Sequence, residues 1–457
     1  MAVETAPRRT PFIAIAQRVI GAGQATGLIA RPQLDKQALM TRAAEETGLS
    51  DFGDPWFEQP FSVLLDSIRD EARLNRAGEF AAGLQFNKVL GDRLRAQDWF
   101  RRYPEILQRS IRRPVVIVGP MRSGTTRLHR LLASDRRFSH MRSFETISPV
   151  PRPGFEQVLE GRKRDFRPVL AKRIMRVARL ANPRTLSIHP TGPMEPEEEL
   201  GLLVSSMYGM KHEAQWRVPS YGRWCERIDA TPAYRQMADL LRLVGWSQQV
   251  SEIHPWVLKT PQHMFDLPAL LNVFPDARII FTHRDPKKFV GSAASLAWNQ
   301  TSIYSDEVTP HEVGEEWMRK SVLQVERMMA ARSLVPAERR IDVGYDAMER
   351  DWRGTMARIY RFLDLDIAPA IPAMERYLDR TRTLKRKPHT YSLAQFGLKE
   401  EAVRERFAAY VERFDIPEER GPEERGPEKS GAPQSPSHSG DARILPHAQS
   451  VPSRTAR

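Results

Sequence analysis

Residues 114–132 read Pro-Val-Val-Ile-Val-Gly-Pro-Met-Arg-Ser-Gly-Thr-Thr-Arg-Leu-His-Arg-Leu-Leu. The pattern predicts a buried strand over Val115–Val118, a glycine-bounded turn, and a helix that begins at Thr125 or Thr126. The backbone N–H groups of such a turn and of the first helical turn converge on one anion. The stretch therefore predicts a phosphate-binding loop within an α/β fold.

The loop lacks one residue that nucleoside triphosphate sites use. Their GxxxxGK[ST] pattern contains a lysine that reaches the β- and γ-phosphates. Here Gly119 and Gly124 keep the glycine spacing, and Thr126 keeps the hydroxyl. Thr125 stands at the lysine position, and a basic residue lies inside the loop at Arg122. We therefore expect a phosphorylated nucleotide that is not hydrolysed as a magnesium-bound triphosphate.

The composition is basic. The 457 residues include 70 Lys and Arg against 57 Asp and Glu, a formal net charge of +13. This balance suits anionic partners such as a nucleotide, a nucleic acid, a membrane surface or a sulfated substrate. The single cysteine, Cys225, allows neither an intrachain disulfide nor a cysteine-based metal site, and it fits a reducing compartment. No signal peptide or long apolar run is evident, so we expect a cytoplasmic protein without a transmembrane segment.

Short apolar strands alternate with helices after Arg113. Strand patterns at 256–259, 278–283 and 340–345 are each followed by a helical pattern. The alternation predicts a P-loop-type parallel sheet flanked by helices, with its ligand site at the carboxyl ends of the strands. Those ends carry the following polar or glycine residues: Gly119, Lys259, His283, Arg284 and Tyr345.

A second cluster, at residues 281–292, predicts another phosphate contact. Arg284 follows a strand, and Ser292 lies eight residues later in the next helix. A guanidinium group offers two parallel donors to a phosphate, and a hydroxyl offers one more. Two phosphate sites, one here and one at Gly119–Thr126, imply a nucleotide with phosphates at two places on its ribose.

These motifs together resemble the sulfotransferase superfamily that uses 3′-phosphoadenosine-5′-phosphosulfate (PAPS). The residues that carry the resemblance are Arg122-Ser-Gly-Thr-Thr after a strand, followed later by Arg284-Asp-Pro and Ser292. The resemblance runs from about Arg113 to Phe414. The stretches similar to the bacterial branch related to the tyrosylprotein sulfotransferases are 255–263, 274–278, 343–346 and 391–398.

The resemblance implies roles for the residues of both clusters. Arg284 and Ser292 would bind the 3′-phosphate, as would the basic run at 385–387. Many members of the family carry lysine at the position of Arg122, and arginine there is expected to stabilise charge only. The residues implied to bind the 5′-phosphosulfate are Arg122, Ser123, Gly124, Thr125 and Thr126.

Sulfuryl transfer requires that the acceptor lose a proton, that negative charge be stabilised and that the attack be in line. Lys259, at a strand end, is expected to face the leaving group. Two residues are candidates for the base. Glu145 resembles the glutamate base of the tyrosylprotein branch and is favoured, whereas His189 lies in a segment that matches the histidine of the cytosolic branch poorly. The acidic run at 195–199 predicts charge at a helix N-terminus, or acceptor binding by Glu195 or Glu198.

The chain divides into four parts on these patterns. We expect a flexible N-terminus at 1–25, a helical region at 26–110 and a sulfotransferase domain at 111–416. An acceptor-side insertion spans 142–242 of that domain. Residues 417–457 are rich in Pro, Glu, Arg, Ser and Gly and predict a disordered tail.

The predicted function is transfer of a sulfuryl group from PAPS to a hydroxyl of a small-molecule, carbohydrate or lipid acceptor. No metal is expected, since the histidines at 129, 263 and 283 have no acidic or sulfur partners at ligand spacing. No nucleic-acid partner is expected, and a homodimer is left open. The alternatives are a P-loop kinase or NTPase, and a nucleotide-binding protein without catalysis.

Overall fold

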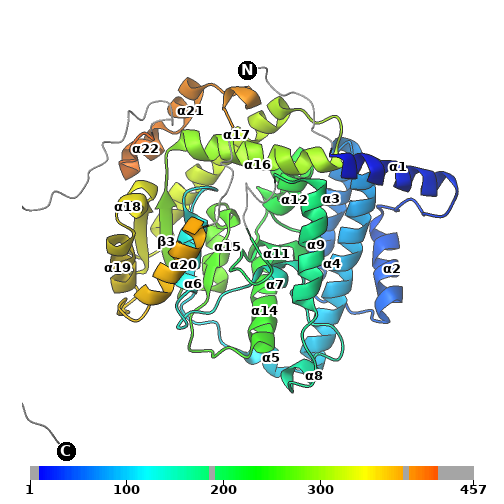
Figure 1. The fold of residues 1–457 in the computed structure, drawn as a ribbon, viewed down its shortest axis with the longest axis horizontal. Helices are drawn as coiled ribbons and strands as arrows, with labels where there is room; N and C mark the ends of the chain where they lie inside the picture. The colour runs from blue at the N-terminus through cyan, green and yellow to red at the C-terminus, as the bar shows by residue number, and fades with distance from the viewer. Residues whose placement is uncertain (1–9, 185–190, 384–390, 420–457) are drawn as a thin grey trace, which may run out of the picture. The chain divides into compact units, whose positions relative to one another are not determined.

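A four-stranded parallel sheet lies at the centre of the fold. In the computed structural model, β1 (Val115–Val118) lies between β2 (Val257–Lys259) and β3 (Arg278–His283), and β4 (Arg340–Gly344) pairs with β3 (Figure 1). Val115 pairs with Val257 on one side and with Arg278 on the other. Since all strands run the same way, their carboxyl ends meet at one edge, as the strand–helix alternation predicted.

The structure describes residues 10–184, 191–383 and 391–419. Residues 1–417 form one compact unit. Among the described residues, no helix has the length and apolar content that crossing a bilayer requires. The predicted tail at 417–457 lies almost wholly outside the described residues.

The sheet is buried on both faces, which explains its continuous runs of branched apolar residues. Val115 and Ile117 contact one core, and Val116 and Val118 contact the other. On the first face lie the helices α6 (Thr125–Ala133), α18 (Tyr345–Arg350), α19 (Trp352–Phe362) and α20 (Ile371–Thr383). The helices around the larger core on the second face include α3 (Glu58–Glu71), α4 (Arg76–Arg102), α14 (Thr231–Gln248), α15 (Leu267–Val273), α16 (Pro286–Tyr304) and α17 (Pro310–Ala331).

The N-terminal region is helical further toward the N-terminus than the sequence indicated. Residues 11–25 form helix α1 (Pro11–Ala25), where we expected a loose segment. The Thr10 side chain caps this helix at the N–H of Ile13, Pro11 suits its first turn, and Ile13 is buried. The apolar pattern of this segment is weak and did not reveal the helix, whose formation the contacts at Thr10 and Pro11 favour. The remaining helices of this region are α2 (Lys36–Thr47) and α5 (Glu105–Gln108).

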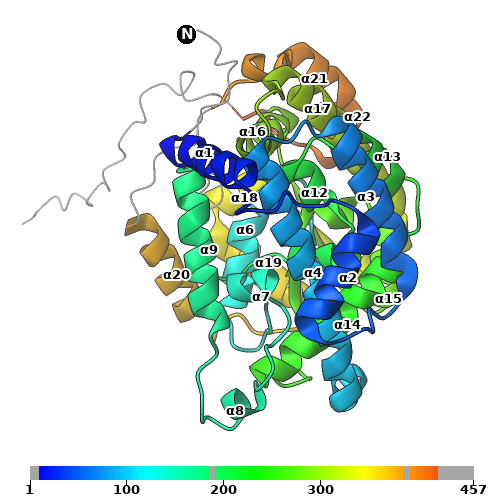
Figure 2. The same ribbon diagram turned by 90° about the vertical axis from the view of Figure 1, so that its right-hand side faces the viewer.

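The segment at 142–242, expected to lie on the acceptor side, consists largely of short helices that lead into α14. They are α7 (Ser143–Ile147), α8 (Glu156–Leu159), α9 (Arg167–Ala181), α11 (Leu200–Leu203), α12 (Met210–Gln215) and α13 (Pro219–Cys225). Figure 2 shows α9 at the surface below α1, with α7 next to it. Near the C-terminus, α21 (Glu400–Arg406) and α22 (Ala408–Phe414) follow the α/β elements.

Candidate active site

The predicted phosphate-binding loop connects β1 to α6 and is tied to β3. The hydroxyl of Ser123 lies 2.8 Å from the hydroxyl of Thr282 and donates to the carbonyl of Pro120 at 2.8 Å. A Cβ atom at Gly119 would lie 1.9 Å from the Thr282 hydroxyl oxygen. Only glycine fits there, because the loop passes so close to the neighbouring strand.

The loop ends in a left-handed turn that starts the helix. Gly124 has a φ of 82°, and α6 begins at the next residue, Thr125, as predicted. Arg122 also lies in the left-handed region, with a φ of 68°. The first N–H groups of a helix have no partners within it, and the helix dipole is positive at that end. The turn therefore presents N–H groups to an anion, as in phosphate-binding loops.

Arg284 lies directly against the loop. Its guanidinium group donates to the backbone carbonyl of Arg122 and stacks 3.7 Å from the centre of the Tyr345 ring. Burial by surrounding atoms lowers the pKa of Arg122, and the positive charge of Arg284 acts in the same direction. The two predicted phosphate-binding clusters thus meet at one edge of the sheet, where two arginine side chains concentrate positive charge.

Ser292 has a buried hydroxyl on α16. The residue is buried, and its Oγ has no hydrogen-bond partner among the described residues. Buried polar atoms in proteins are nearly always paired, so this unpaired hydroxyl, on a helix that starts beside Arg284, is available to a polar ligand. The adjacent Gly291 leaves room for Tyr391, whose ring atom would lie 2.8 Å from a Cβ there.

Lys259, the last residue of β2, connects the sheet edge to the loop helix. Its side chain is 2% exposed; the ammonium group forms an ion pair with Glu198 and lies 3.4 Å from the hydroxyl of Thr126. Its backbone N–H donates to the carboxylate of Glu199 at 2.9 Å. A cation, a carboxylate and the beginning of the phosphate-binding helix therefore meet at one point.

A buried chain of polar groups supports this strand end. The Glu199 carboxylate lies 2.6 Å from Nε2 of His263, and Nδ1 of His263 lies 2.8 Å from the hydroxyl of Tyr234. All three residues are buried. Glu199 thus holds the backbone of Lys259 in place, a role that the run of glutamates in the sequence did not reveal.

Glu198 is the carboxylate at the site, and it differs from its neighbours. Its side chain is 19% exposed, while Glu197 and Glu199 are buried. Helix α11 begins only at Leu200 and has no acidic residue in its first turn. The run nevertheless lies at this helix N-terminus, because Glu199 is the N-cap residue of α11, so its interpretation as charge at a helix N-terminus stays a prediction. Glu195, the other residue considered for acceptor binding, pairs with Arg380 at 3.2 Å.

Among the described residues, Glu145 makes hydrogen bonds and an ion pair with neighbouring side chains and backbone rather than contacts with the loop. Its carboxylate accepts hydrogen bonds at 2.8 Å from the backbone N–H of Arg142 and at 2.8 Å from the side-chain amide of Gln248, and it pairs with the Arg142 guanidinium group. The residue is fully buried as part of the capping box of α7. These contacts give no support to Glu145 as the base, a role that remains untested. His189 and the basic run at 385–387 lie outside the described residues.

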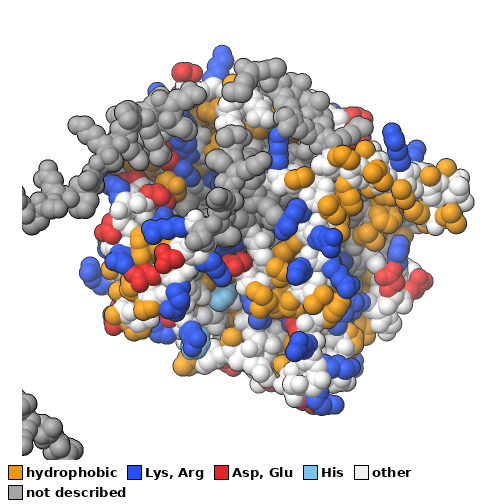
Figure 3. All heavy atoms as spheres, viewed as in Figure 1, with side chains coloured by type: hydrophobic (Ala, Val, Ile, Leu, Met, Phe, Trp, Pro, Cys, Tyr) orange, Lys and Arg blue, Asp and Glu red, His pale blue; other side chains and the backbone are white. Residues whose placement is uncertain are grey.

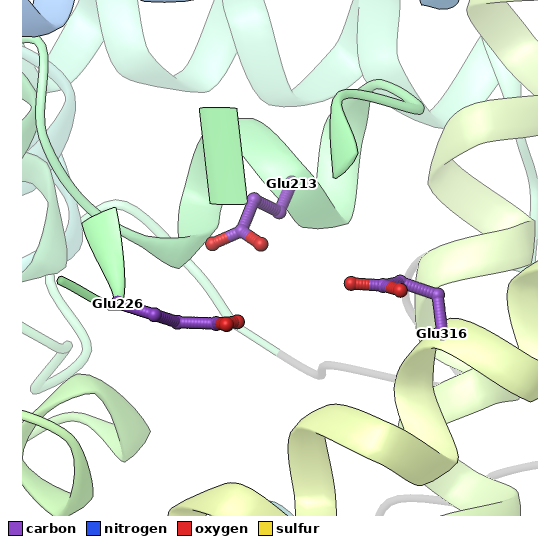
Figure 4. A group of neighbouring side chains, drawn as sticks. All are labelled: Glu213, Glu226 and Glu316. Atoms are coloured by element: carbon purple, nitrogen blue, oxygen red, sulfur yellow. The ribbon is translucent and has the colours of Figure 1, made fainter. Parts of the chain in front are cut away.

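Three carboxylates lie close together away from the loop: Glu213 on α12, Glu226 at the end of α13 and Glu316 on α17 (Figure 4). Their ligand atoms lie within 4.8 Å of one another, close enough to hold a metal ion. However, Lys320 pairs with Glu213 and Glu226, and Arg319 pairs with Glu226 and Glu316. The group is therefore a neutralised ion-pair network. The absence of a metal stays a prediction.

Comparison with known proteins gives one consistent result. Residues 114–369 match the model of the sulfotransferase family. Omega-hydroxy-beta-dihydromenaquinone-9 sulfotransferase Stf3 from Mycobacterium bovis is 25% identical over 299 residues, which are 63% of this chain and 72% of that protein. The same enzyme from Mycobacterium tuberculosis matches equally well.

Solved structures agree with the sequence comparison. Sulfotransferase STF1 from Mycobacterium tuberculosis superposes with a TM-score of 0.72 at 32% identity, covering 83% of this chain and 100% of that one. For sulfotransferase STF9 from Mycobacterium avium the TM-score is 0.74 at 26% identity, over 84% of this chain and 98% of that one. These matches confirm the predicted fold class and favour sulfuryl transfer over the kinase and binding-protein alternatives. The chain belongs to the sulfotransferase family and is an enzyme that transfers a sulfuryl group.

Proposed function

We propose that the chain transfers the sulfuryl group of PAPS, by in-line attack, to a hydroxyl group of a small-molecule, carbohydrate or lipid acceptor. The observation that carries the proposal is the meeting of Lys259, Glu198 and Thr126 at the edge of the phosphate-binding loop. The name of the Stf3 relative, which acts on a hydroxylated dihydromenaquinone, supports an acceptor hydroxyl on an apolar molecule. The single cysteine, Cys225, supports a cytoplasmic location.

The residues present fit a nucleotide with phosphates at both ends of its ribose. The N–H groups after Gly124 and the side chain of Arg122 suit the 5′-phosphosulfate. Arg284 suits the 3′-phosphate, and the unpaired hydroxyl of Ser292 supports a polar ligand on α16. PAPS, when bound, supplies the sulfuryl group and a stable leaving group, adenosine 3′,5′-bisphosphate.

We assign Lys259 to the leaving group. A bond forms between the acceptor oxygen and sulfur while the bond between sulfur and the phosphate oxygen breaks, so negative charge grows on that phosphate oxygen. A cation held rigidly in a buried position stabilises such charge strongly. Lys259 is anchored by the backbone bond to Glu199 and lies beside Thr126, where the loop helix begins.

We assign the acceptor proton to Glu198. A general base must lie within hydrogen-bond reach of the hydroxyl that it deprotonates. Glu198 is partly exposed and adjoins the loop through Lys259, whereas Glu145 is fully buried among structural partners. The Lys259 ammonium group lies directly beside this carboxylate, so the proposed base and the proposed leaving-group cation adjoin each other. One pair thus serves both proton removal and charge stabilisation.

Ligand-dependent melting tests the donor. Adenosine 3′,5′-bisphosphate without magnesium is expected to raise the melting temperature, while ATP with magnesium has little effect. The variant Ser292→Ala should reduce the shift. Ser321→Ala is the matched control, because Ser321 is a buried helical serine whose hydroxyl donates to the Trp317 carbonyl at 2.7 Å. A shift with ATP and magnesium alone would contradict the proposal.

A transfer screen tests the acceptor. Labelled PAPS is incubated with the enzyme and with separated lipid and water-soluble extracts of the native host. A labelled product that requires the enzyme and is lost with Lys259→Ala identifies the acceptor class. Label transferred only to protein would contradict a small-molecule, carbohydrate or lipid acceptor.

A further inference from the structure

Helix α9 presents an apolar face to solvent, opposite to what is usual for a helix on a globular protein. Its residues spaced by three and four positions share one side of the helix. Together with the exposed apolar residues of α1, their relative exposures lie between 37% and 59%. The residues are Phe166, just before α9, with Val169, Ile174, Val177 and Leu180, and Phe12, Ile15 and Val19 of α1.

The two helices lie side by side. The hydroxyl of Thr10, which caps α1, donates to the carbonyl of Ala181 at the end of α9 at 3.0 Å. Figure 2 shows α1 lying across the end of α9. The exposed apolar residues of α1 and α9 form one surface, which we call the α1/α9 face. Adjacent exposed apolar groups on a protein surface form a candidate interaction site.

Every charge within these two helices is positive. Neither α1 nor α9 contains an acidic residue. The exposed cations of α9 are Lys172, Arg173, Arg176 and Arg179, and the guanidinium group of Arg173 lies 5.6 Å from the centre of the Phe166 ring. Figure 3 shows hydrophobic side chains over α1, and others interspersed with Lys and Arg over α9. The α1/α9 face therefore combines apolar side chains with positive charge that no acidic residue of α1 or α9 offsets.

We propose that the α1/α9 face docks on the surface of a membrane that contains anionic lipids. A helix with an apolar side flanked by Lys and Arg lies in the headgroup region, with its apolar side chains in the acyl boundary and its cations near lipid phosphates. The long basic side chains reach outward while their carbon stems stay in apolar surroundings. Docking is peripheral, and the chain stays on one side of the bilayer.

A second copy of the chain fits this face less well. A symmetric dimer places the same surface of both copies together. The cations of one α9, such as Arg173 and Arg176, would then lie against the positively charged surface of the other copy, and α1 and α9 contain no acidic residue to offset them. Like charges brought together at an interface are costly, whereas anionic lipids neutralise them.

The α1/α9 face is joined to the site through the C-terminal end of α9. At its end, the side chain of Asn182 donates to the carbonyl of Asn299 at 2.8 Å, on the helix that carries Ser292. Docking would hold the acceptor side of the enzyme against the bilayer, where a lipid alcohol lies; this functional part rests on the proposed function.

Vesicle sedimentation tests the docking itself. The full chain is mixed with vesicles of phosphatidylcholine alone or with vesicles that also contain about 30% phosphatidylglycerol, an anionic lipid. The vesicles and any bound protein are then pelleted. We expect wild type to pellet with the anionic vesicles, and more weakly at high salt. Val177→Ser with Leu180→Ser, and separately Arg173→Glu with Arg176→Glu, should each lower the partition coefficient more than about tenfold.

Matched controls remove exposed groups elsewhere. Ile253→Ser with Leu334→Ser loses two exposed apolar side chains, and Arg361→Glu with Arg406→Glu reverses two exposed charges. These controls should pellet like wild type, and melting curves check that every variant folds. If wild type stays in the supernatant of anionic vesicles, or if the α9 variants pellet as wild type does, the proposal is wrong.

Sedimentation velocity tests the alternative that a second copy of the chain covers the α1/α9 face. If wild type is a dimer that Val177→Ser with Leu180→Ser converts to a monomer, and neither binds vesicles, the face joins two copies and the membrane proposal is overturned. Vesicle binding does not depend on catalysis, so it can succeed even where the proposed donor or acceptor fails.

Discussion

The ammonium group of Lys259 lies 3.4 Å from the hydroxyl of Thr126. This contact joins the end of β2 to the start of α6, because Lys259 pairs in register with Ile117 of β1, just before the loop. The lysine that nucleoside triphosphate sites carry within their loop is absent here, and a lysine from the neighbouring strand reaches the loop helix instead. The arrangement makes Lys259 the group whose loss should affect turnover most directly.

Lys259→Ala is expected to lower kcat by about 100- to 1,000-fold, the usual cost of removing one group that stabilises transition-state charge. The dissociation constant for adenosine 3′,5′-bisphosphate should change far less. Steady-state kinetics and calorimetry measure the two quantities separately. Equal losses in kcat and nucleotide affinity would show that Lys259 serves binding alone.

Glu198→Gln is expected to reduce kcat by about 100-fold or more, since it removes the proposed base while keeping the side chain's size. Melting temperature should fall, because the buried ammonium group of Lys259 loses its ion-pair partner, while nucleotide affinity should stay close to wild type. Full activity in this variant would exclude Glu198 as the base.

Glu145→Gln is the matching substitution at the other candidate base. Glu145 is fully buried and accepts three hydrogen bonds, so this variant should lose about 1–3 kcal/mol of unfolding free energy. Its kcat should fall much less than that of Glu198→Gln under conditions where both proteins are folded. The reverse order of kcat values would restore Glu145 as the base.

Gly119→Ala should abolish the melting shift that adenosine 3′,5′-bisphosphate causes. The new methyl group would lie 1.9 Å from the Thr282 hydroxyl oxygen and force the loop away from β3. Gly192→Ala is the control, because the nearest atom to its Cβ would lie 3.6 Å away. A normal shift in Gly119→Ala would mean that the loop does not depend on this close approach.

Acid is expected to destabilise the protein through buried histidines. Burial lowers the pKa of His212 to about 3 and that of His140 to about 4. Because the unfolded state binds these protons near pH 6.5, the unfolding free energy should fall as pH decreases from 6.5 toward 4. His212→Phe should flatten this fall by about 2–3 kcal/mol at pH 4.5. Urea unfolding of both proteins between pH 4.5 and 8 measures the difference, and parallel curves would contradict it.

The sheet and the loop could be predicted because each depends on local pattern. The strand at Val115–Val118 is a short run of branched apolar residues, and the glycines at 119 and 124 mark the turn. The apolar run and the glycine spacing each lie within about ten residues of sequence. The strand, the turn and the helix that follows them could therefore be predicted from local pattern alone.

The contacts of the candidate bases could not be predicted from the sequence because they depend on long-range packing. Glu197, Glu198 and Glu199 are identical in sequence, yet only the middle one pairs with the ammonium group of Lys259. That difference is set by the position of β2, about 60 residues away, as the separation of the bonded residues shows. Glu145 was favoured by its resemblance to a family motif, which does not reveal that Gln248 and Arg142 occupy its carboxylate.

The central claim is that the loop and Arg284 bind opposite ends of one nucleotide, and calorimetry tests it most directly. Adenosine 3′,5′-bisphosphate and adenosine 5′-monophosphate are each titrated into wild type and Arg284→Met. The account predicts that wild type binds the bisphosphate at least about tenfold more tightly, since a guanidinium–phosphate contact adds a charged hydrogen-bonded pair, and that Arg284→Met loses this preference while still binding the monophosphate. Equal affinities for both nucleotides in wild type, or an unchanged preference in Arg284→Met, would contradict it.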